Sequence, residues 1–205
     1  MKEYPSILGS KGKDFREFDS YVFDKIDGSN LRWEWARKSG WYKNGTRTRL
    51  FDESDPVFGC AVEIFKNTLS EPLEKIAKDN RWDRCIVFTE FCGNLSFAGK
   101  HVESDSKYLT VIDIAPYKKG ILGPKEFLKL CGNISIPNFL GCYKWNRNFV
   151  EEIREGKLEG ITFEGVVGKA GESHKLIMRK AKTQAWIDKV LAQYGEIEGA
   201  KIIES

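Results

Sequence analysis

The sequence of 205 residues lacks several features that would assign it to a whole class of proteins. It has no apolar run as long as a membrane span, and its first residues, MKEYPSILGSKGK, lack the apolar stretch of a signal peptide. It also has no internal repeat, no low-complexity tract and no linker rich in Pro, Gly or Ser. We therefore expect a single domain over residues 1–205, in a cytoplasmic protein that does not contact membranes.

Cysteine and histidine are too few and too scattered for a metal centre built on them. The five cysteines include no CxxC pair, and their number is odd. This pattern favours reduced thiols over a zinc site or a disulfide framework. The two histidines, His101 and His174, are isolated in the sequence, so we expect solvated or hydrogen-bonded structural side chains.

Neither sign of charge is in strong excess, because 33 basic and 30 acidic residues leave a net charge of +3. The global charge therefore does not identify a nucleic-acid binder, and only local clustering could do so. Lys11 with Lys13 and Lys118 with Lys119 form such clusters. A run of like charges is more often a solvated face, so these clusters decide little.

What the sequence does contain is a series of short strand patterns interrupted by a few helical ones. Residues 31–35, for example, alternate apolar and polar side chains as a half-buried strand does. By the same criteria we expect strands at 21–23, 31–35, 41–50, 84–91, 108–114, 160–169 and 174–182, and helices at 54–69, 124–130, 149–154 and 183–193. The fold class is α+β with mostly antiparallel sheet, flanked by helices.

Four short segments carry candidate chemistry: KIDG (25–28), FTEF (88–91), EGVVGK (164–169) and KAK (180–182). Lys25 has two readings, as a surface lysine beside an Asp-Gly turn or as a nucleophile. The tetrapeptide KIDG alone favours the first reading, a surface lysine beside a turn. The order of all four segments, each in or next to an expected strand, favours the nucleophile.

In this order the segments resemble motifs I, III, IV and V of the covalent nucleotidyltransferases, which are DNA ligases, RNA ligases and mRNA capping enzymes. The resemblance is closest to ATP-dependent RNA ligases of the nick-sealing and repair branch. Asn30 stands where DNA ligases and capping enzymes usually have arginine, and KAKT followed by Trp186 is similar to the RNA-ligase form of motif V. The resemblance implies an ATP-grasp-like ligase adenylation (nucleotidyltransferase) domain. Only 23 residues follow Lys182, so we expect no OB-fold.

The resemblance implies that Lys25 attacks the α-phosphate of ATP and forms a lysyl-AMP adduct. A lysine amine with a pKa of about 10.4 is protonated at neutral pH and cannot attack. Burial beside Lys180, Lys182 and a bound Mg²⁺ would free its lone pair. Glu90 and Glu164 are expected to hold Mg²⁺, for which Mn²⁺ is expected to substitute, or the ribose hydroxyls.

The resemblance assigns further nucleotide contacts to residues around Lys25. Asp24 and the neighbouring backbone, including Ile26, are expected to read the adenine edge. Asp27 either orients the lysine or shapes the turn. Asn30 belongs to the same KxxGxN pattern and is expected to contact the nucleotide.

Other contacts are expected farther along the chain. By resemblance to the family's downstream arginine motif, Arg47 contacts the ribose or a 5′-phosphate, although Arg49 lies on the same face of the expected strand. Tyr108 is expected to stack on the base, with Leu109 as the alternative. Lys169 is expected to be peripheral.

The resemblance implies RNA ends as partners, a 5′-phosphate and a 3′-hydroxyl, also within a nicked duplex, and cooperation with end-healing enzymes. The expected activity is ATP-dependent RNA ligation, in which AMP passes from Lys25 to the 5′-phosphate and is then displaced by the 3′-hydroxyl. The alternatives are a compact ATP-dependent DNA ligase core, a capping-type enzyme that uses GTP, and a non-catalytic relative that binds nucleic-acid ends.

Overall fold

The computed structural model describes residues 3–10 and 15–204, so the predicted basic pair Lys11 and Lys13 lies outside the described residues. The chain forms two compact units, each built on one sheet. The first unit comprises Met1–Tyr4, Gly28–Ile136 and Glu172–His174, and the second comprises Pro5–Asp27, Pro137–Gly171 and Lys175–Ser205. The α+β class with mostly antiparallel sheets is confirmed. The assignment of residues 1–205 to one domain stays a prediction.

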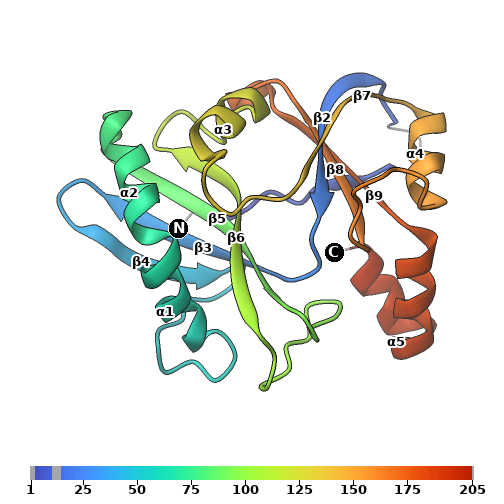
Figure 1. Cartoon of the computed structure of the whole chain (residues 1–205), viewed down its shortest axis with the longest axis horizontal. Coiled ribbons are helices and arrows are strands. Elements are labelled where there is room, and N and C mark those ends of the chain that lie inside the picture. The colour runs from blue at the N-terminus through green and yellow to red at the C-terminus, as the bar shows by residue number, and fades with distance from the viewer. Residues whose placement is uncertain (1–2, 11–14, 205) are drawn as a thin grey trace. The chain divides into compact units, whose positions relative to one another are not determined.

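The first unit contains an antiparallel sheet of order β4-β3-β5-β6 and three helices (Figure 1). The strands are β3 (Ser29–Ala36), β4 (Gly40–Thr46), β5 (Arg84–Gly93) and β6 (Lys107–Pro116), and the helices are α1 (Gly59–Thr68), α2 (Ser70–Asp79) and α3 (Pro124–Cys131). One face of this sheet is apolar: Trp33 stacks on Phe65 of α1 with ring centroids 4.0 Å apart. Because side chains alternate along a strand, Asn30 of β3 and Glu90 of β5 fall on the opposite face.

The second unit contains a sheet of order β1-β9-β8-β2-β7, in which the β1–β9 pair is parallel and the other pairs of these strands are antiparallel. The strands are β1 (Leu8–Gly9), β2 (Phe18–Lys25), β7 (Phe139–Trp145), β8 (Gly165–Ala170) and β9 (Ile177–Lys182), and the helices are α4 (Arg147–Arg154) and α5 (Gln184–Glu204), with the short 3₁₀ turn η1 (Ser173–Lys175) before β9.

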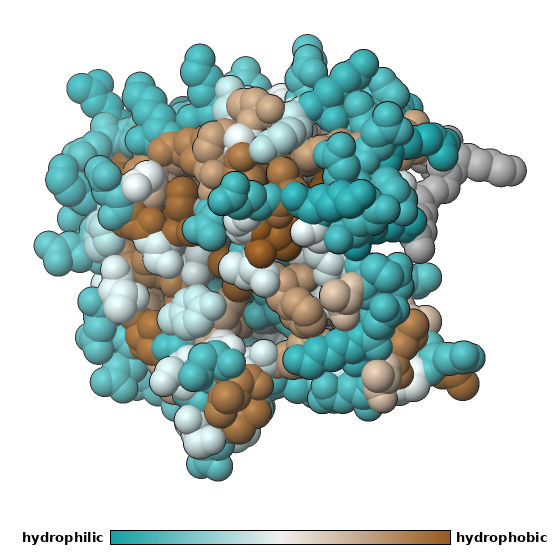
Figure 2. Space-filling model, turned by 45° about the vertical axis from the view of Figure 1, so that its right-hand side comes forward, coloured by the Kyte–Doolittle hydropathy of each residue, from teal (hydrophilic) through white to brown (hydrophobic). Residues whose placement is uncertain are grey.

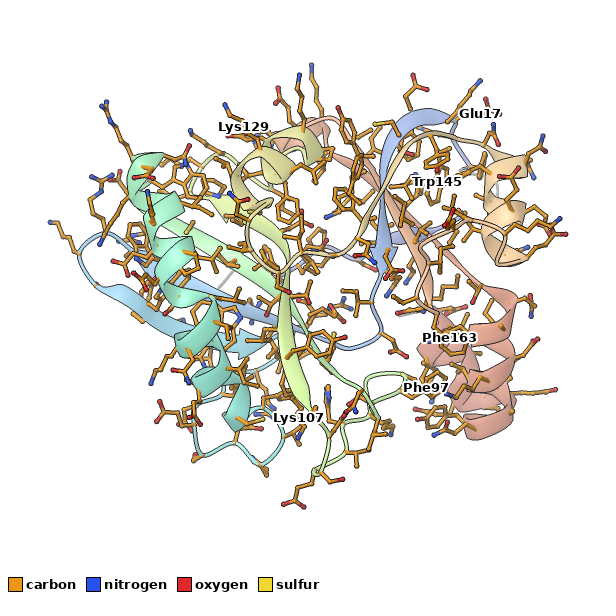
Figure 3. The ribbon with its side chains drawn as sticks, viewed as in Figure 1. Glu17, Phe97, Lys107, Lys129, Trp145 and Phe163 are labelled. Carbon is orange, nitrogen blue, oxygen red and sulfur yellow. The ribbon has the colours of Figure 1, made fainter. Side chains whose placement is uncertain are left out.

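Helix α4 covers one face of the second sheet with apolar side chains. Trp145, labelled in Figure 3, is fully buried in a cluster with Val22, Phe149 and Ile153. Because Val22 belongs to this cluster, the alternation of β2 places Phe23 and Lys25 on the other face. The packing of α4 therefore fixes the orientation of β2.

The structure departs from the sequence prediction at several element boundaries. The strand predicted at 41–50 ends at Thr46, and the helix predicted from residue 54 begins at Gly59, because Asp55 accepts hydrogen bonds from the amides of Val57 and Phe58 and forms a turn there. The strand predicted from residue 160 begins at Gly165. Helix α2 and strands β1 and β7 were not predicted.

Figure 2 shows apolar side chains exposed among hydrophilic ones. Some of the exposed large side chains are aromatic: Tyr42, Tyr108, Tyr117, Phe139 and Phe163. Exposed aromatic rings are the side chains on which nucleic-acid bases stack. Within residues 3–10 and 15–204, no helix combines the length and the apolar character needed to cross a membrane.

Candidate functional site

Three adjacent strands of the second unit bring two of the predicted lysines into one row. Lys25 of β2 is paired with Gly165 of β8, and Gly165 is paired with Lys182 of β9. Residues paired in this way project from the same face of a sheet. Gly165 has a φ of +147°, and a Cβ atom there would lie 2.0 Å from the carbonyl oxygen of Ala181, so only glycine fits between the lysines.

Glu164 lies immediately before β8 and joins the two lysines. Its Oε2 is 2.9 Å from Nζ of Lys25, and its Oε1 is 3.0 Å from Nζ of Lys182. The Glu164 side chain is buried, and that of Lys25 is 21% exposed. One buried carboxylate thus separates two ammonium groups, and the partly exposed one is the predicted nucleophile.

The pKa of Lys182 is shifted by its surroundings in this row. Burial lowers its pKa from the ordinary value, and the charge of Lys25 lowers it further, while Glu164 and Asp27 oppose the shift. Its Nζ also lies 4.1 Å from the centre of the Trp186 ring, a favourable cation–π position. The two lysines therefore influence each other electrostatically, as a cationic site for phosphate requires.

Asp27 is fixed by a residue 159 positions away in the sequence. The indole Nε1 of Trp186 donates a hydrogen bond to Oδ2 of Asp27 at 3.0 Å. Trp186 lies in the first turn of α5, where the amide of Trp186 donates to Oγ1 of Thr183. The same indole therefore contacts both the predicted motif around Lys25 and, through its ring face, Lys182.

Lys180 lies on the same face as Lys182, because the two residues are separated by one position in β9. Its Nζ donates a hydrogen bond to the carbonyl of Glu204 at 2.9 Å. Nζ of Lys182 donates similarly to the carbonyl of Ile202 at 3.3 Å. The end of α5 thus contacts both lysines of the KAK segment.

Asp24 points to the face opposite Lys25. Its Oδ1 accepts from the amide of Thr162 and its Oδ2 from the Thr162 hydroxyl, at 3.0 and 2.8 Å. Burial raises the pKa of this carboxyl group, although the hydrogen bonds from Thr162 oppose the shift. The Asp24 carboxylate thus holds Thr162, two residues before Glu164, next to β2. Ile26, two residues after Asp24, is half-buried, and for both residues nucleotide contact stays a prediction.

Lys169 is a residue that the sequence analysis underestimated. It is buried rather than peripheral, and its Nζ lies 5.3 Å from the centre of the Phe23 ring. Because it lies four residues after Gly165 in β8, it projects from the same face as Lys25. The alternation of side chains along the strand predicted for EGVVGK would have predicted this position of Lys169.

The first unit carries the other predicted nucleotide ligands on one sheet face. Asn30 is paired with Glu90, and Glu90 with Thr110, across β3, β5 and β6. Nδ2 of Asn30 is buried and lacks a hydrogen-bond partner among the described residues. Buried amides are normally paired, so this donor is a candidate contact for a ligand of the first unit.

Tyr108 and Leu109 lie on opposite faces of β6. The Tyr108 side chain is 45% exposed, whereas that of Leu109 is 3% exposed. Tyr108 is paired with Cys92, so it shares the face of Glu90. The exposed ring is the one available for stacking, which favours Tyr108 over Leu109 as the base-stacking residue.

Arg47 and Arg49 do not share a strand face, because β4 ends at Thr46 and the chain turns. Arg49 forms an ion pair with Asp55. Arg47 instead lies near the buried hydroxyl of Tyr4. Burial raises the pKa of Tyr4, Asp113 and Glu90 raise it further, and Arg47 lowers it.

Two features of the first unit were not predicted as candidate-site contacts. The Tyr4 hydroxyl donates to Oδ2 of Asp113 at 2.5 Å. Nε2 of His101 lies 2.9 Å from Oγ of Ser29, and its Nδ1 lies 3.2 Å from Oγ of Ser96. His101 is therefore a hydrogen-bonded structural histidine, as expected, and it fixes the residue next to Asn30. No local sequence signal indicates either contact.

The carboxylates of Glu164 and Glu90 are the side chains predicted to bind Mg²⁺. Both oxygens of Glu164 face ammonium groups, and residues 3–10 and 15–204 contain no cluster of three His, Cys, Asp or Glu side chains suited to a metal. Mg²⁺ often uses only one or two carboxylates together with substrate phosphates. Glu164 and Glu90, each within its own unit, fit that mode, and the ion would neutralise phosphate charge.

The fold is similar to that of several solved RNA ligase structures. Archaeal ATP-dependent RNA ligase form 1 is 18% identical with a TM-score of 0.67, over 99% of this chain and 56% of that chain, and form 2 is 15% identical with a TM-score of 0.65, over 94% and 51%. A mutant of Naegleria gruberi RNA ligase with ATP and Mn is 14% identical with a TM-score of 0.61, over 83% and 51%.

This chain therefore spans about half the length of these structures. No protein-family model matches the chain, and no curated protein matches it. At these identities the likeness shows the fold, and it confirms the predicted resemblance to RNA ligases at that level.

Proposed function

We propose that the chain is the nucleotidyltransferase part of an ATP-dependent RNA ligase. The observation that carries the proposal is the arrangement of Lys25, Glu164 and Lys182 across β2, β8 and β9. A partly exposed amine beside a buried cation is what attack on an α-phosphate requires. The similar archaeal structures are ATP-dependent RNA ligases, which supports the proposal.

In the proposed first step, Lys25 loses a proton and its Nζ attacks the α-phosphorus of ATP. Oε2 of Glu164, 2.9 Å away, is an acceptor for that proton. The new N–P bond replaces the P–O bond to pyrophosphate, which leaves. Lys182 and Lys180 hold the phosphate oxygens, because fixed cations stabilise charge in phosphoryl-type transfers.

In the later steps, AMP passes from Lys25 to the 5′-phosphate of an RNA strand, and a 3′-hydroxyl displaces AMP to form the phosphodiester. The polar face of the first unit, with Asn30, Arg47, Glu90 and Tyr108, is proposed to bind nucleotide or RNA. Asp24, Ile26 and Asp27 are proposed to support nucleotide binding in the second unit. Mg²⁺, or Mn²⁺ as named for the Naegleria structure, would accompany the phosphates.

The direct test is formation of a covalent adduct. Incubation with Mg²⁺ and α-labelled ATP should give a labelled band that survives denaturation and disappears in Lys25→Ala. Lys175→Ala, at an exposed lysine of the second unit, is the matched control and should be labelled like the wild type. An unlabelled wild-type protein would overturn the proposal.

The substrate is tested separately. Nicked duplexes with RNA or DNA on the 3′-hydroxyl side distinguish an RNA ligase from a compact DNA ligase core. Labelled GTP in place of ATP would reveal a capping-type enzyme. A protein that binds nucleic-acid ends with strong salt dependence but forms no adduct would be the non-catalytic relative.

A further inference from the structure

The end of α5 lies on the ammonium groups that the proposed function assigns to phosphate. The carbonyl of Glu204 accepts from Lys180 at 2.9 Å, and that of Ile202 accepts from Lys182 at 3.3 Å. Both acceptors are backbone carbonyl oxygens of residues 196–204. They therefore engage ammonium groups through the same kind of contact as phosphate oxygens do.

The contacts of Lys182 leave little capacity for another ligand. An ammonium group has three N–H donors. The named partners of Lys182 are also three: Oε1 of Glu164 at 3.0 Å, the Ile202 carbonyl at 3.3 Å and the Trp186 ring at 4.1 Å. Glu164 and Trp186 are buried. The carbonyl of Ile202 is therefore the partner that a phosphate oxygen would replace.

Helix α5 reaches the lysines because it is not one continuous helix. Gly195 has a φ of 72° and a ψ of 176°, a backbone conformation that essentially only glycine adopts. It divides α5 into residues 184–194 and a returning segment, residues 196–204. A Cβ atom on Gly195 would have no heavy atom within 4 Å, so the backbone torsion, not close packing, requires glycine there.

A second glycine lets the returning segment pack on the first part of α5. Gly199 is buried, and a Cβ atom there would lie 3.0 Å from Cδ2 and 3.4 Å from Cα of Leu191. A larger side chain at this position would push the returning segment away. A substitution at Gly195, through the backbone torsion, and one at Gly199, through side-chain volume, should thus both displace residues 196–204.

We propose that residues 196–204 form an autoinhibitory latch, which occupies the donors of Lys180 and Lys182 and moves away about Gly195 when a nucleotide phosphate binds. The proposal rests on the proposed function only in taking these lysines as phosphate ligands. When a protein binds its ligand only in the open fraction of molecules, the apparent affinity is reduced by that fraction. Weakening the latch should therefore tighten binding.

The test measures the binding of ATP to the full chain by calorimetry in EDTA, where no chemistry proceeds. Gly195→Ala and Gly199→Val should each lower the apparent Kd roughly tenfold, because each destabilises the closed arrangement. Gly156→Ala is the matched control: Gly156 has a φ of +69° and no heavy atom within 4 Å of an added Cβ, but it lies after α4. Its Kd should equal that of the wild type.

Hydrogen exchange of the wild-type protein gives a second measurement that needs no variant. Saturating ATP should accelerate exchange of the amides of residues 196–204. If both variants bind ATP no more tightly than the wild type, or if these amides keep their protection with ATP bound, the latch is disproved. Absence of the Lys25 adduct together with tighter binding by both variants would reject the ligase proposal and leave the latch standing.

Discussion

Glu164 forms an ion pair with Lys25, with Oε2 2.9 Å from its Nζ, while Oε1 lies 3.0 Å from Nζ of Lys182. The carboxylate thus compensates two positive charges of which one is buried. Removing it would leave Lys25 and Lys182 facing each other across Gly165 without a counter-charge. The pairing therefore matters for stability as well as for the proposed chemistry.

The first prediction follows from this pairing. Glu164→Gln should lower the free energy of unfolding by about 3 kcal/mol, because breaking a buried ion pair leaves uncompensated buried charge. It should also abolish adduct formation. Urea unfolding monitored by fluorescence measures the stability change. Glu152→Gln, at an exposed position of α4, is the control and should stay within about 0.5 kcal/mol of the wild type. An equally small change for Glu164→Gln would contradict the role of the carboxylate.

The second prediction concerns the hydrogen bond between Trp186 and Asp27. Trp186→Phe keeps an aromatic ring near Lys182 but removes the indole donor. A double-mutant cycle with Asp27→Ala should show a coupling energy of about 1 kcal/mol in the free energy of unfolding, since residues in direct contact are not additive. Additivity of the two single changes would show that this hydrogen bond does not contribute to stability.

The sequence indicated that Lys25 and Lys182 lie at the ends of strands, which is why their place in the fold could be predicted. The segments KIDG, EGVVGK and KAK each contain a position whose pairing is fixed once three strands are adjacent. The contacts that could not be predicted link distant segments: Tyr4 with Asp113 is separated by 109 positions, and Ser29 with His101 by 72. Such pairs depend on tertiary packing, which no local pattern encodes.

The end of α5 shows a different reason for a missed feature. The helix was predicted to end at residue 193, and a glycine such as Gly195 is an ordinary helix-ending signal. In the structure the helical conformation resumes after Gly195 and continues to Glu204. A glycine allows a helix either to end or to resume after a turn. Here the packing of Gly199 on Leu191 stabilises the second arrangement. The contacts of Ile202 and Glu204 with the lysines follow from that packing.

The third prediction distinguishes the roles of two neighbouring residues of β6, Tyr108 in ATP binding and Leu109 in stability. Tyr108→Ala should weaken ATP binding roughly tenfold, because base–aromatic stacking contributes about 1–3 kcal/mol per base. Its stability should change little, since the ring is 45% exposed. Leu109→Ala should instead cost about 2–4 kcal/mol of stability through a buried cavity. Calorimetric ATP titrations and urea unfolding of both variants check this, with Tyr108→Phe as the conservative control. The reverse pattern would assign stacking to position 109.

The fourth prediction concerns thiol reactivity. Cys60 and Cys142 are exposed, whereas Cys85, Cys92 and Cys131 are buried, and burial raises the pKa of Cys85 to about 12. Only thiolates react with disulfide reagents, so at pH 8 the native protein should titrate two thiols rapidly and the denatured protein all five. Cys60→Ser and Cys142→Ser should each reduce the rapid count by one. Rapid reaction of a third thiol would contradict the burial of the core cysteines.

The fifth prediction concerns the pH dependence of stability at Asp55. The hydrogen bond from Arg49 lowers the pKa of this carboxyl from its ordinary value of 3.8 to about 2. Because the folded-state pKa is lower than the unfolded one, the unfolded chain takes up the proton first as the pH falls. The stabilisation is therefore fully present above about pH 4 and is lost between about pH 4 and 2.

Asp55→Asn removes this titration but keeps Oδ1, which accepts from the amides of Val57 and Phe58. Urea unfolding between pH 2 and 5 should give a shallower pH dependence of the free energy for this variant than for the wild type. Asp19→Asn, at an exposed position of β2, should keep the wild-type slope. An unchanged slope in Asp55→Asn would mean that the ion pair with Arg49 does not persist in solution, and Arg49 would then compete with Arg47 as the phosphate-contacting arginine.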